Sequence, residues 1–259
     1  FGGIGIHYLC IMPSPADIKL FRSLKDKSSR EEHRLFVAET PKVISDLIAG
    51  GLHAEVIYSL HECLSDWQKK YPHLKIEGVS NKDLERLSFL KQPHEVCAFF
   101  RIPERKRFVQ QNVTFILDNI SDPGNMGTIM RTAHWFGIKN IVCTENSVDI
   151  YNPKVVQSTM GSLARVNVHY CSKDEIASML DKKTTICGAF MNGENIFTTQ
   201  LQAPLAIIIG SEAHGIVSLE SLVQRRISIP AHNADDHPES LNASVAAAII
   251  MSVVSKFSE

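Results

Sequence analysis

The stretch DNISDPGNMGTIMRT (residues 118–132) leads from the polar end of an apolar run, through a Pro-Gly turn, into an apolar-periodic segment. A strand, a turn and a helix in this order predict a loop at the carboxyl edge of a sheet, where open α/β sheets bind ligands. Gly124 and Gly127 do not form a phosphate loop, because the spacing GxxxxGK[ST] is absent. What remains is the polar content of the segment, chiefly Asn125 and Arg131.

Asn125 lies near the predicted helix start and Arg131 lies six residues further on. Their side chains converge only if the start of the helix bends toward the site. An arginine on a helix is usually a solvated surface residue. Here apolar neighbours favour packing of Arg131 among core residues: Ile129, Met130, Ala133 and Trp135.

Two further stretches have the same character, IIIGSEAHGI (207–216) and ISIPAHNADDHPESLNASVA (227–246). Each begins at the carboxyl end of an apolar strand and runs into polar or small residues. Any one of them taken alone is typical of an ordinary strand-to-helix turn. Three such loops at one sheet edge predict a ligand site.

The chain reads as an α/β protein in two parts. Residues 12–102 form a small domain, with strands expected at 35–39, 54–60, 74–79 and 95–102. Its helices begin after Ser14 and Thr40, each followed by proline, and further helical segments lie near 61–70 and 81–88. Gly50 and Gly51 suit a left-handed helix end. Residues 103–111, with a proline and a burst of charge, read as a linker.

Residues 112–259 form the second domain. Apolar strands are expected at 113–119, 140–143, 184–190, 204–210 and 226–229, with helix-like stretches between them. This alternation implies crossover connections and a mostly parallel sheet. The chain closes with a long helix rich in small residues over 240–257. Residues 1–11 lack a signal-peptide pattern, and we expect them to be either a disordered extension or a remnant of an expression tag.

Composition narrows the class of protein. The formal net charge is −1, so any nucleic-acid binding must come from local basic patches. Six cysteines without a CxxC pair or metal-ligand spacing favour reduced thiols and a cytoplasmic location. No apolar run reaches membrane-spanning length, and we expect no membrane association.

Together the three stretches resemble the signature motifs of the SPOUT methyltransferases, in particular the SpoU/TrmH branch of RNA ribose 2′-O-methyltransferases. LDNISDPGNMGTIMRTAHWFGI is similar to the first motif, IIIGSEAHGI to the second, and IP…ESLNASVAAAI to the third; YNPKVVQSTMGSLARV (151–166) matches the segment between the first two. The first domain resembles the small RNA-binding domain that many members carry, which is itself similar to kink-turn-binding ribosomal proteins. SLKDKSSREEHRLFVAETPKVI is its typical opening.

The resemblance implies a trefoil knot in the second domain and S-adenosylmethionine (AdoMet) as cofactor. Gly210, Ile229 and Leu241 would line its pocket, and a side chain at Gly210 would block close approach of the adenosyl group. The reaction implied is methyl transfer to a ribose 2′-hydroxyl of rRNA or tRNA, with rRNA favoured, and it needs no metal.

The catalytic residues implied are Asn125, Arg131, Glu212, Ser240 and Asn242. In the family the residue matching Arg131 is proposed as the base, but a guanidinium is hard to deprotonate. We therefore expect Arg131 to bind phosphate and stabilise the developing oxyanion. Asn125 and Asn242 would orient it and the ribose, while Ser240 and Glu212 hold that network and Glu212 gives Arg131 a charged partner.

The partners implied are RNA and a second copy of the chain. A homodimer would pack the knot region and the C-terminal helix against the partner and complete the site across the interface. RNA contacts in the first domain are expected from its basic run: Lys19, Arg22, Lys25, Lys27 and Arg30.

Two alternatives remain open. The chain could be a non-catalytic RNA-binding or ribosome-assembly protein that kept the fold, although the polar site residues are all present. The second alternative is a nucleotide-dependent enzyme of Rossmann type, and the absence of a GxGxxG motif after a strand weighs against it. A metal site in the loop with His232, Asp235, Asp236 and His237 is disfavoured against a solvated polar loop, because the ligand spacing is not a recognised one.

Overall fold

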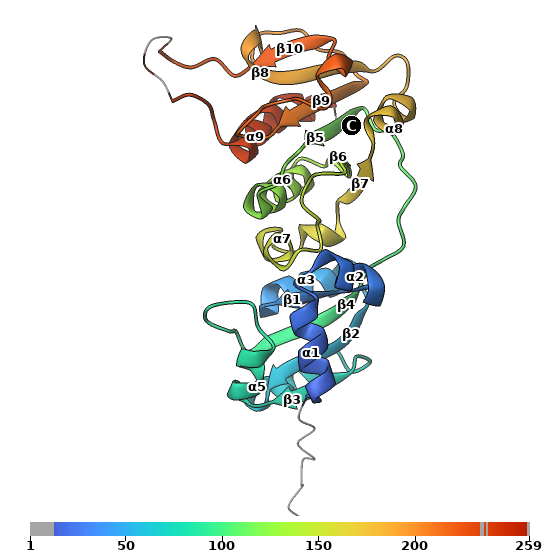
Figure 1. The fold of residues 1–259 in the computed structure, drawn as a ribbon, viewed down its shortest axis with the longest axis vertical. Coiled ribbons are helices and arrows are strands. Elements are labelled where there is room, and N and C mark those ends of the chain that lie inside the picture. Colours follow the sequence, from blue (N-terminus) through green and yellow to red (C-terminus); the bar gives the residue numbers. More distant parts are fainter. Residues whose placement is uncertain (1–12, 234–235, 237, 258–259) are drawn as a thin grey trace, which may run out of the picture. The chain divides into compact units, whose positions relative to one another are not determined.

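The computed structural model describes residues 13–233, 236 and 238–257. The chain divides into two compact units, one ending at Pro103 and the other beginning at Glu104 (Figure 1). The expectation for residues 1–11 lies outside the described residues. In the part of the chain that the structure describes, no helix has the length and apolarity needed to cross a membrane.

The first unit is built on a four-stranded sheet in the order β1-β4-β2-β3. The strands are β1 (Leu35–Glu39), β2 (Ala54–Leu60), β3 (Ile76–Val79) and β4 (Val96–Arg101). β4 pairs antiparallel with β1 and β2, whereas β2 and β3 are parallel. The helices are α1 (Pro15–Ser23), α2 (Lys27–His33), α3 (Pro41–Ala49), α4 (His61–Lys70) and α5 (Asn81–Arg86). The predicted strands and the helices at 61–70 and 81–88 are confirmed to within two residues.

Local chemistry explains where the helices of this unit begin and end. Ser14 and Asp17 form a capping box: Asp17 N donates to Ser14 Oγ (3.1 Å) and Ser14 N donates to Asp17 Oδ2 (2.9 Å). Thr40 occupies the N-cap of α3, but its hydroxyl makes no cap hydrogen bond and its φ is 73°. The left-handed residue after α3 is Gly51, with φ of 86°.

The basic run of the first unit is divided between two helices, and this corrects one expectation. α1 ends at Ser23 and α2 begins at Lys27. Arg30 is only 2% exposed, and its Nη1 donates to the carbonyls of Leu24 and Lys25, both at 2.8 Å. Arg30 therefore caps the end of α1 from inside the unit, and the expectation that it contacts RNA is wrong. Lys19, Arg22, Lys25 and Lys27 are exposed.

The second unit contains a six-stranded sheet in the order β10-β8-β9-β5-β6-β7. The strands are β5 (Val113–Asp118), β6 (Asn140–Thr144), β7 (Asn167–Cys171), β8 (Thr185–Asn195), β9 (Leu205–Gly210) and β10 (Arg225–Ser228). All five neighbouring pairs are parallel, which confirms the predicted sheet. β7 was not predicted. It is a half-buried edge strand of mixed composition, NVHYC, and gives no apolar run.

The helices of this unit are α6 (Pro123–Trp135), α7 (Pro153–Ser158), α8 (Lys173–Met179) and α9 (Ala243–Val254). α6, α7 and α9 lie on one face of the sheet and α8 on the other (Figure 1). Gly127 explains how closely α6 and α7 pack, since a Cβ there would lie 2.3 Å from Ser158 Cβ. This glycine of the opening motif thus serves helix packing. The trefoil knot stays a prediction, since part of the segment it involves (234–235 and 237) lies outside the described residues.

The predicted linker, residues 103–111, contains no helix or strand. Its later half belongs to the second unit: Phe108 packs against the core there. Gln110 Nε2 donates to Thr184 Oγ1 (2.6 Å), and Asp181 N donates to Gln110 Oε1 (2.7 Å). These contacts fix the chain immediately before β5.

Candidate active site

The three motif loops meet at the carboxyl edge of the central strands. β5 and β9 are paired so that Asp118 lies opposite Gly210, the last residues of the two strands. The loop after β5 opens α6, the loop after β9 carries Glu212, and the segment after β10 leads to α9. The expectation that these loops share one edge is confirmed.

A hydrogen-bonded network joins one residue from each motif. Asn125 Nδ2 donates to Glu212 Oε1 at 2.8 Å, and Asn242 Nδ2 donates to Asn125 Oδ1 at 2.9 Å. Asn242 Nδ2 also makes a very short hydrogen bond to Glu212 Oε1. Three of the five predicted catalytic residues are therefore in direct contact, although they are far apart in the sequence.

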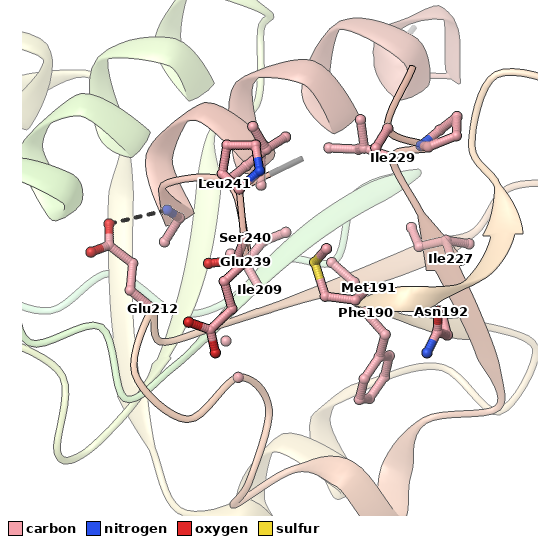
Figure 2. A pocket seen from close by; sticks show the side chains of 18 of the residues that line it. Phe190, Met191, Asn192, Ile209, Glu212, Ile227, Ile229, Glu239, Ser240 and Leu241 are labelled. Atoms are coloured by element: carbon pink, nitrogen blue, oxygen red, sulfur yellow. Dashed lines mark hydrogen bonds between the residues drawn. The ribbon is translucent and has the colours of Figure 1, made fainter. Parts of the chain in front are cut away.

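The amino-terminal end of α9 supports the carboxylate of Glu212. Ala243 N donates to Glu212 Oε1 at 3.2 Å, the bond drawn in Figure 2. Asn242 is the N-cap of this helix, and its Oδ1 accepts from Ser244 N (3.0 Å) and Val245 N (3.2 Å). The third motif therefore positions the Glu212 side chain through one backbone donor and one amide donor.

Asp118 anchors the second motif loop, a role that sequence reasoning missed. Its carboxylate is fully buried, and Oδ2 accepts from the backbone N–H groups of Val217 (2.9 Å), Ser218 (2.8 Å) and Leu219 (3.2 Å). Asn119 adds a second link, since its Nδ2 donates to Ser218 Oγ at 2.8 Å. The available signal was an acidic residue at the end of an otherwise apolar strand, where an unpaired buried charge would be costly.

A cavity of about 960 Å³ lies beside this network. All three predicted cofactor residues, Gly210, Ile229 and Leu241, line it, and so does Ser240. Figure 2 shows Ile229 and Leu241 on one wall and Glu212 at one end. We call this space the first cavity.

Gly210 is also required by the fold of its own loop, in addition to the predicted reason, which stays a prediction. A Cβ at this position would lie 2.1 Å from the carbonyl carbon of Gly215 and 2.3 Å from Ile216 N. Ser211 and Gly215 are also joined by two backbone hydrogen bonds, of 3.1 and 2.8 Å. The turn over 211–215 folds back on Gly210, so the glycine is required by the protein backbone before any ligand is considered.

A second cavity, of about 750 Å³, lies on the other side of the shared wall Ser211, Glu212 and Ala213. Its remaining lining comes from the loops after β5, β6 and β9 and from the first turn of α6: Asn119, Ile120, Ser121, Asp122, Asn125, Asn146, His214 and Val217. Glu212 therefore lines two cavities that meet at the polar network.

Two predicted catalytic residues stand outside the network. Arg131 is exposed, lines neither cavity, and forms no ion pair with Glu212 in the described structure. Ser240 likewise makes no hydrogen bond to another described residue. The expectation that Arg131 is packed among core residues is wrong: Ile129, Met130 and Ala133 are buried, but α6 turns Arg131 and Trp135 outward, and Trp135 is 86% exposed.

The described residues contain no group of three or more histidine, cysteine, aspartate or glutamate side chains placed to hold a metal ion. Of the four residues weighed as a metal site, Asp235 and His237 lie outside the described residues. His134 Nδ1 contacts Ser162 Oγ at 3.1 Å, which ties α6 to the turn that follows α7.

Comparison with known proteins gives a family for each unit. Residues 112–252 match the SpoU rRNA Methylase family, and residues 16–98 match the MRM3-like substrate binding domain. The chain is 26% identical to the protein named rRNA methyltransferase 3, mitochondrial, from Homo sapiens, over 88% of this chain and 69% of that one. It is 24% identical to the 23S rRNA (guanosine(2553)-2'-O)-methyltransferase RlmP of Bacillus subtilis (strain 168), over 90% of this chain and 94% of that one.

Two solved structures are similar over both units. A putative RNA methyltransferase of the TrmH family from Porphyromonas gingivalis is 30% identical, with a TM-score of 0.81, over 93% of this chain and 97% of that one. The SpoU methyltransferase AviRb from Streptomyces viridochromogenes, solved in complex with AdoMet, is 22% identical, with a TM-score of 0.83, over 94% and 98%. At 22% identity, the similarity to AviRb shows only that the two proteins share a fold. Because the family match spans the sheet, the three motif loops and the network that joins them, this chain belongs to the SpoU rRNA methylase family.

Proposed function

We propose that this protein is an AdoMet-dependent RNA methyltransferase that modifies a ribose 2′-hydroxyl, with rRNA as the favoured substrate. The observation that carries the proposal is the contact among Asn125, Glu212 and Asn242 at the wall between two cavities. One cavity can hold a methyl donor and the other the acceptor. The names of the human and B. subtilis relatives support rRNA, and the name of the latter supports the 2′-oxygen.

The first cavity fits AdoMet in shape and charge. Ile209, Ile227, Ile229 and Leu241 offer apolar walls for the adenosyl group, while Glu212 and Glu239 contribute carboxylates. AdoMet carries a sulfonium and an ammonium group, which these carboxylates would stabilise. When bound, it supplies an activated methyl group. The fit requires no metal ion.

The network residues then act on the acceptor. Asn125 and Asn242 use their amides on one another and on Glu212, so each side chain is held in one orientation. In this proposal the 2′-hydroxyl binds beside these fixed polar groups, and positioning of this kind is a large contribution to catalysis. Glu212 stays close to the reacting oxygen as an acceptor for its proton or as a hydrogen-bond partner.

Arg131 would reach the site from a second copy of the chain. Within one chain it is exposed and apart from the network, yet it lies on α6, which packs beside α9. Each of these two helices carries an exposed apolar side chain, Trp135 (86%) on α6 and Val245 (46%) on α9, which favours a partner against these helices. A homodimer would then bring the partner's guanidinium to the RNA phosphate and the developing oxyanion.

The first unit would supply RNA affinity. Its match to the MRM3-like substrate binding domain supports this role, and Lys19, Arg22, Lys25 and Lys27 are exposed at its surface. A cytoplasmic location stays a prediction, because relatives include both mitochondrial and bacterial proteins.

The test is methyl transfer from labelled AdoMet to total RNA from a strain that lacks the gene. Digestion to nucleosides should yield a single labelled 2′-O-methylnucleoside, and calorimetry should show AdoMet binding without added metal. A protein that binds RNA but neither binds AdoMet nor transfers methyl would instead be the non-catalytic RNA-binding alternative.

A further inference from the structure

We propose that the second cavity receives the base of the target nucleotide, and that Asn146 and His214 are the residues that recognise it. This inference rests on the proposed function, because it assumes that the acceptor is an RNA ribose. It adds a specificity site, built from the loops after β6 and β9, to the network that the three motifs form.

Position is the first argument. The second cavity shares Ser211, Glu212 and Ala213 with the first, and Asn125 of the network lines it as well. A methyl group passing from a donor in the first cavity must be accepted at this shared wall. A ribose whose 2′-oxygen lies at the wall places its base within the second cavity or at its mouth.

The chemistry of the lining is the second argument. The described lining of the second cavity contains no lysine or arginine, so it does not suit a phosphate. It offers amide, hydroxyl, imidazole and carboxylate groups, together with the apolar surfaces of Ile120 and Val217. RNA bases that are turned out of a stack are recognised in this way, by hydrogen bonds to their edges and contacts to their faces. Phosphates then stay outside, within reach of the basic residues.

The rigidity of the walls is the third argument. Asn119 N donates to Thr144 Oγ1 (2.9 Å), and Val148 N donates to Ile120 O (2.8 Å), so the loops after β5 and β6 are joined. The buried carboxylate of Asp118 joins the loop after β9 to them. A cavity held on three sides is preformed, which suits discrimination between bases.

Asn146, His214 and Ser121 are the polar side chains of this cavity that the protein itself leaves available, and Asn146 and His214 are the two large enough to cover a base edge or face. Both are exposed, and neither side chain hydrogen-bonds to another described residue. By contrast, three other side chains of the cavity already have partners. Asn119 Nδ2 donates to Ser218 Oγ, Asp122 Oδ1 accepts from Asn125 N at the start of α6, and Asn125 Nδ2 donates to Glu212 Oε1. An amide can donate to and accept from one base edge, and an imidazole can stack on a base face.

The experiment measures steady-state methyl transfer to undermethylated total RNA for Asn146→Ala and His214→Ala. Each should lower kcat/KM for RNA by roughly tenfold, the usual effect of removing a single interaction with a base. The Kd for AdoMet, measured by calorimetry, should change less than twofold. Gln202→Ala removes an exposed amide of the same unit that lines neither cavity, and it should behave as wild type.

A second variant separates recognition from a structural effect. Asn146→Asp keeps the shape but replaces a donor by an acceptor, so primer extension should show methylation at a different set of nucleotides. Unchanged kcat/KM and unchanged methylation positions in all three cavity variants, with an active wild type, would overturn the inference. Loss of AdoMet binding in Asn146→Ala would overturn it too, because the cavity would then hold part of the cofactor. An inactive wild type would reject the proposed function itself.

Discussion

The side-chain amide of Asn125 donates to the carboxylate of Glu212 at 2.8 Å, across 87 residues of sequence. Asn242 contacts both of them, and it is a further 30 residues beyond Glu212. The strand pairing of Asp118 with Gly210 brings the first two loops together, and α9 adds the third. The network is therefore a product of the fold and reports directly on whether the three loops are correctly placed.

Glu212→Gln should abolish methyl transfer while the protein remains folded. The neutral amide would direct an N–H group at Asn125, Asn242 or Ala243, all of which donate to Glu212 in the structure. We expect a loss of roughly 100-fold or more in kcat, typical of removing a positioned group near a reacting oxygen. Combining it with Asn125→Ala should add little, because residues of one network are not additive. Additive losses would show that the two residues act separately.

Arg131→Ala and Arg131→Lys should both lose methyl transfer but keep AdoMet affinity, because a lysine cannot reproduce the planar guanidinium. If the arginine acts across a dimer interface, mixing Arg131→Ala with Glu212→Gln should restore part of the activity, since one site of each mixed dimer is intact. The measurement is turnover after mixing and exchange of subunits. Mixtures as inactive as their parents would place Arg131 in its own chain's site.

Trp135→Glu should shift the protein toward monomers in light scattering at micromolar concentration. The side chain is 86% exposed on α6, and burial of an aromatic residue of this kind is a large part of interface energy. Phe197→Glu is the matched control, since Phe197 is 57% exposed but lies outside α6 and α9. If Trp135→Glu remains dimeric and Phe197→Glu does not, the dimer interface lies near Phe197 and not on α6.

The sequence was sufficient to predict the strands that line the site and the three loops, because apolar runs that end in polar motifs are local signals. It was not sufficient for β7, a half-buried edge strand, or for the break between α1 and α2. Those depend on packing: Arg30 is buried only because the ends of α1 and α2 meet around its guanidinium. A basic residue in a charge run gives no sign of such a partner.

In the candidate active site too, local motifs could be predicted from the sequence, whereas contacts made by the fold could not. Asn125, Glu212 and Asn242 could be named from their motifs, yet their mutual hydrogen bonds depend on three loops that only the fold brings together. Gly210 was assigned to the cofactor pocket, and it does line the first cavity, but its close approach to Gly215 of its own loop could not be predicted from the sequence. Arg131 was expected in the core because its neighbours are apolar, but the helical period of α6 turns it outward.

Glu39 should make the first unit less stable as the pH rises. Burial raises the pKa of its carboxyl above the ordinary 4.5, an effect that hydrogen bonds from Ser88 and Phe89 N only partly offset. A raised pKa in the folded state means that the stabilising contribution is complete below the unfolded pKa and is lost as pH rises through the folded pKa. In denaturant unfolding at several pH values, the free energy of unfolding of Glu39→Gln should not show this loss, whereas that of the wild type should.

The control for that experiment is Glu55→Gln. The pKa of Glu55 is lowered, chiefly by its hydrogen bond from Arg101, so its contribution has the opposite sign and is lost as pH falls. The pair is exposed, and its effect should be small because solvent screens it. The same pH dependence in wild type and Glu39→Gln would mean that Glu39 ionises freely.

Lys25→Glu combined with Lys27→Glu should weaken RNA binding and flatten its salt dependence. Both side chains are exposed, and removing one phosphate contact lowers the slope of log affinity against log salt by about 0.7 to 0.9. AdoMet binding should not change, since the first cavity is lined by residues from 189 onward. Lys69→Glu with Lys82→Glu makes the same charge change at exposed lysines of α4 and α5, outside the basic run.

Arg30→Ala should behave differently from the lysine variants although it lies in the same basic run. Its Nη1 bonds to the carbonyls of Leu24 and Lys25, both at 2.8 Å, so its loss leaves buried acceptors unpaired and costs about 1–3 kcal/mol of stability. Once folded, the variant should keep the wild-type salt slope, because the buried guanidinium does not reach phosphate. RNA affinity at two salt concentrations and the thermal midpoint should therefore separate the two groups. A flattened salt slope in Arg30→Ala at wild-type stability would show that Arg30 does contact RNA. Equal salt slopes in wild type and in the lysine double variant would show that the basic run is only a solvated helix face.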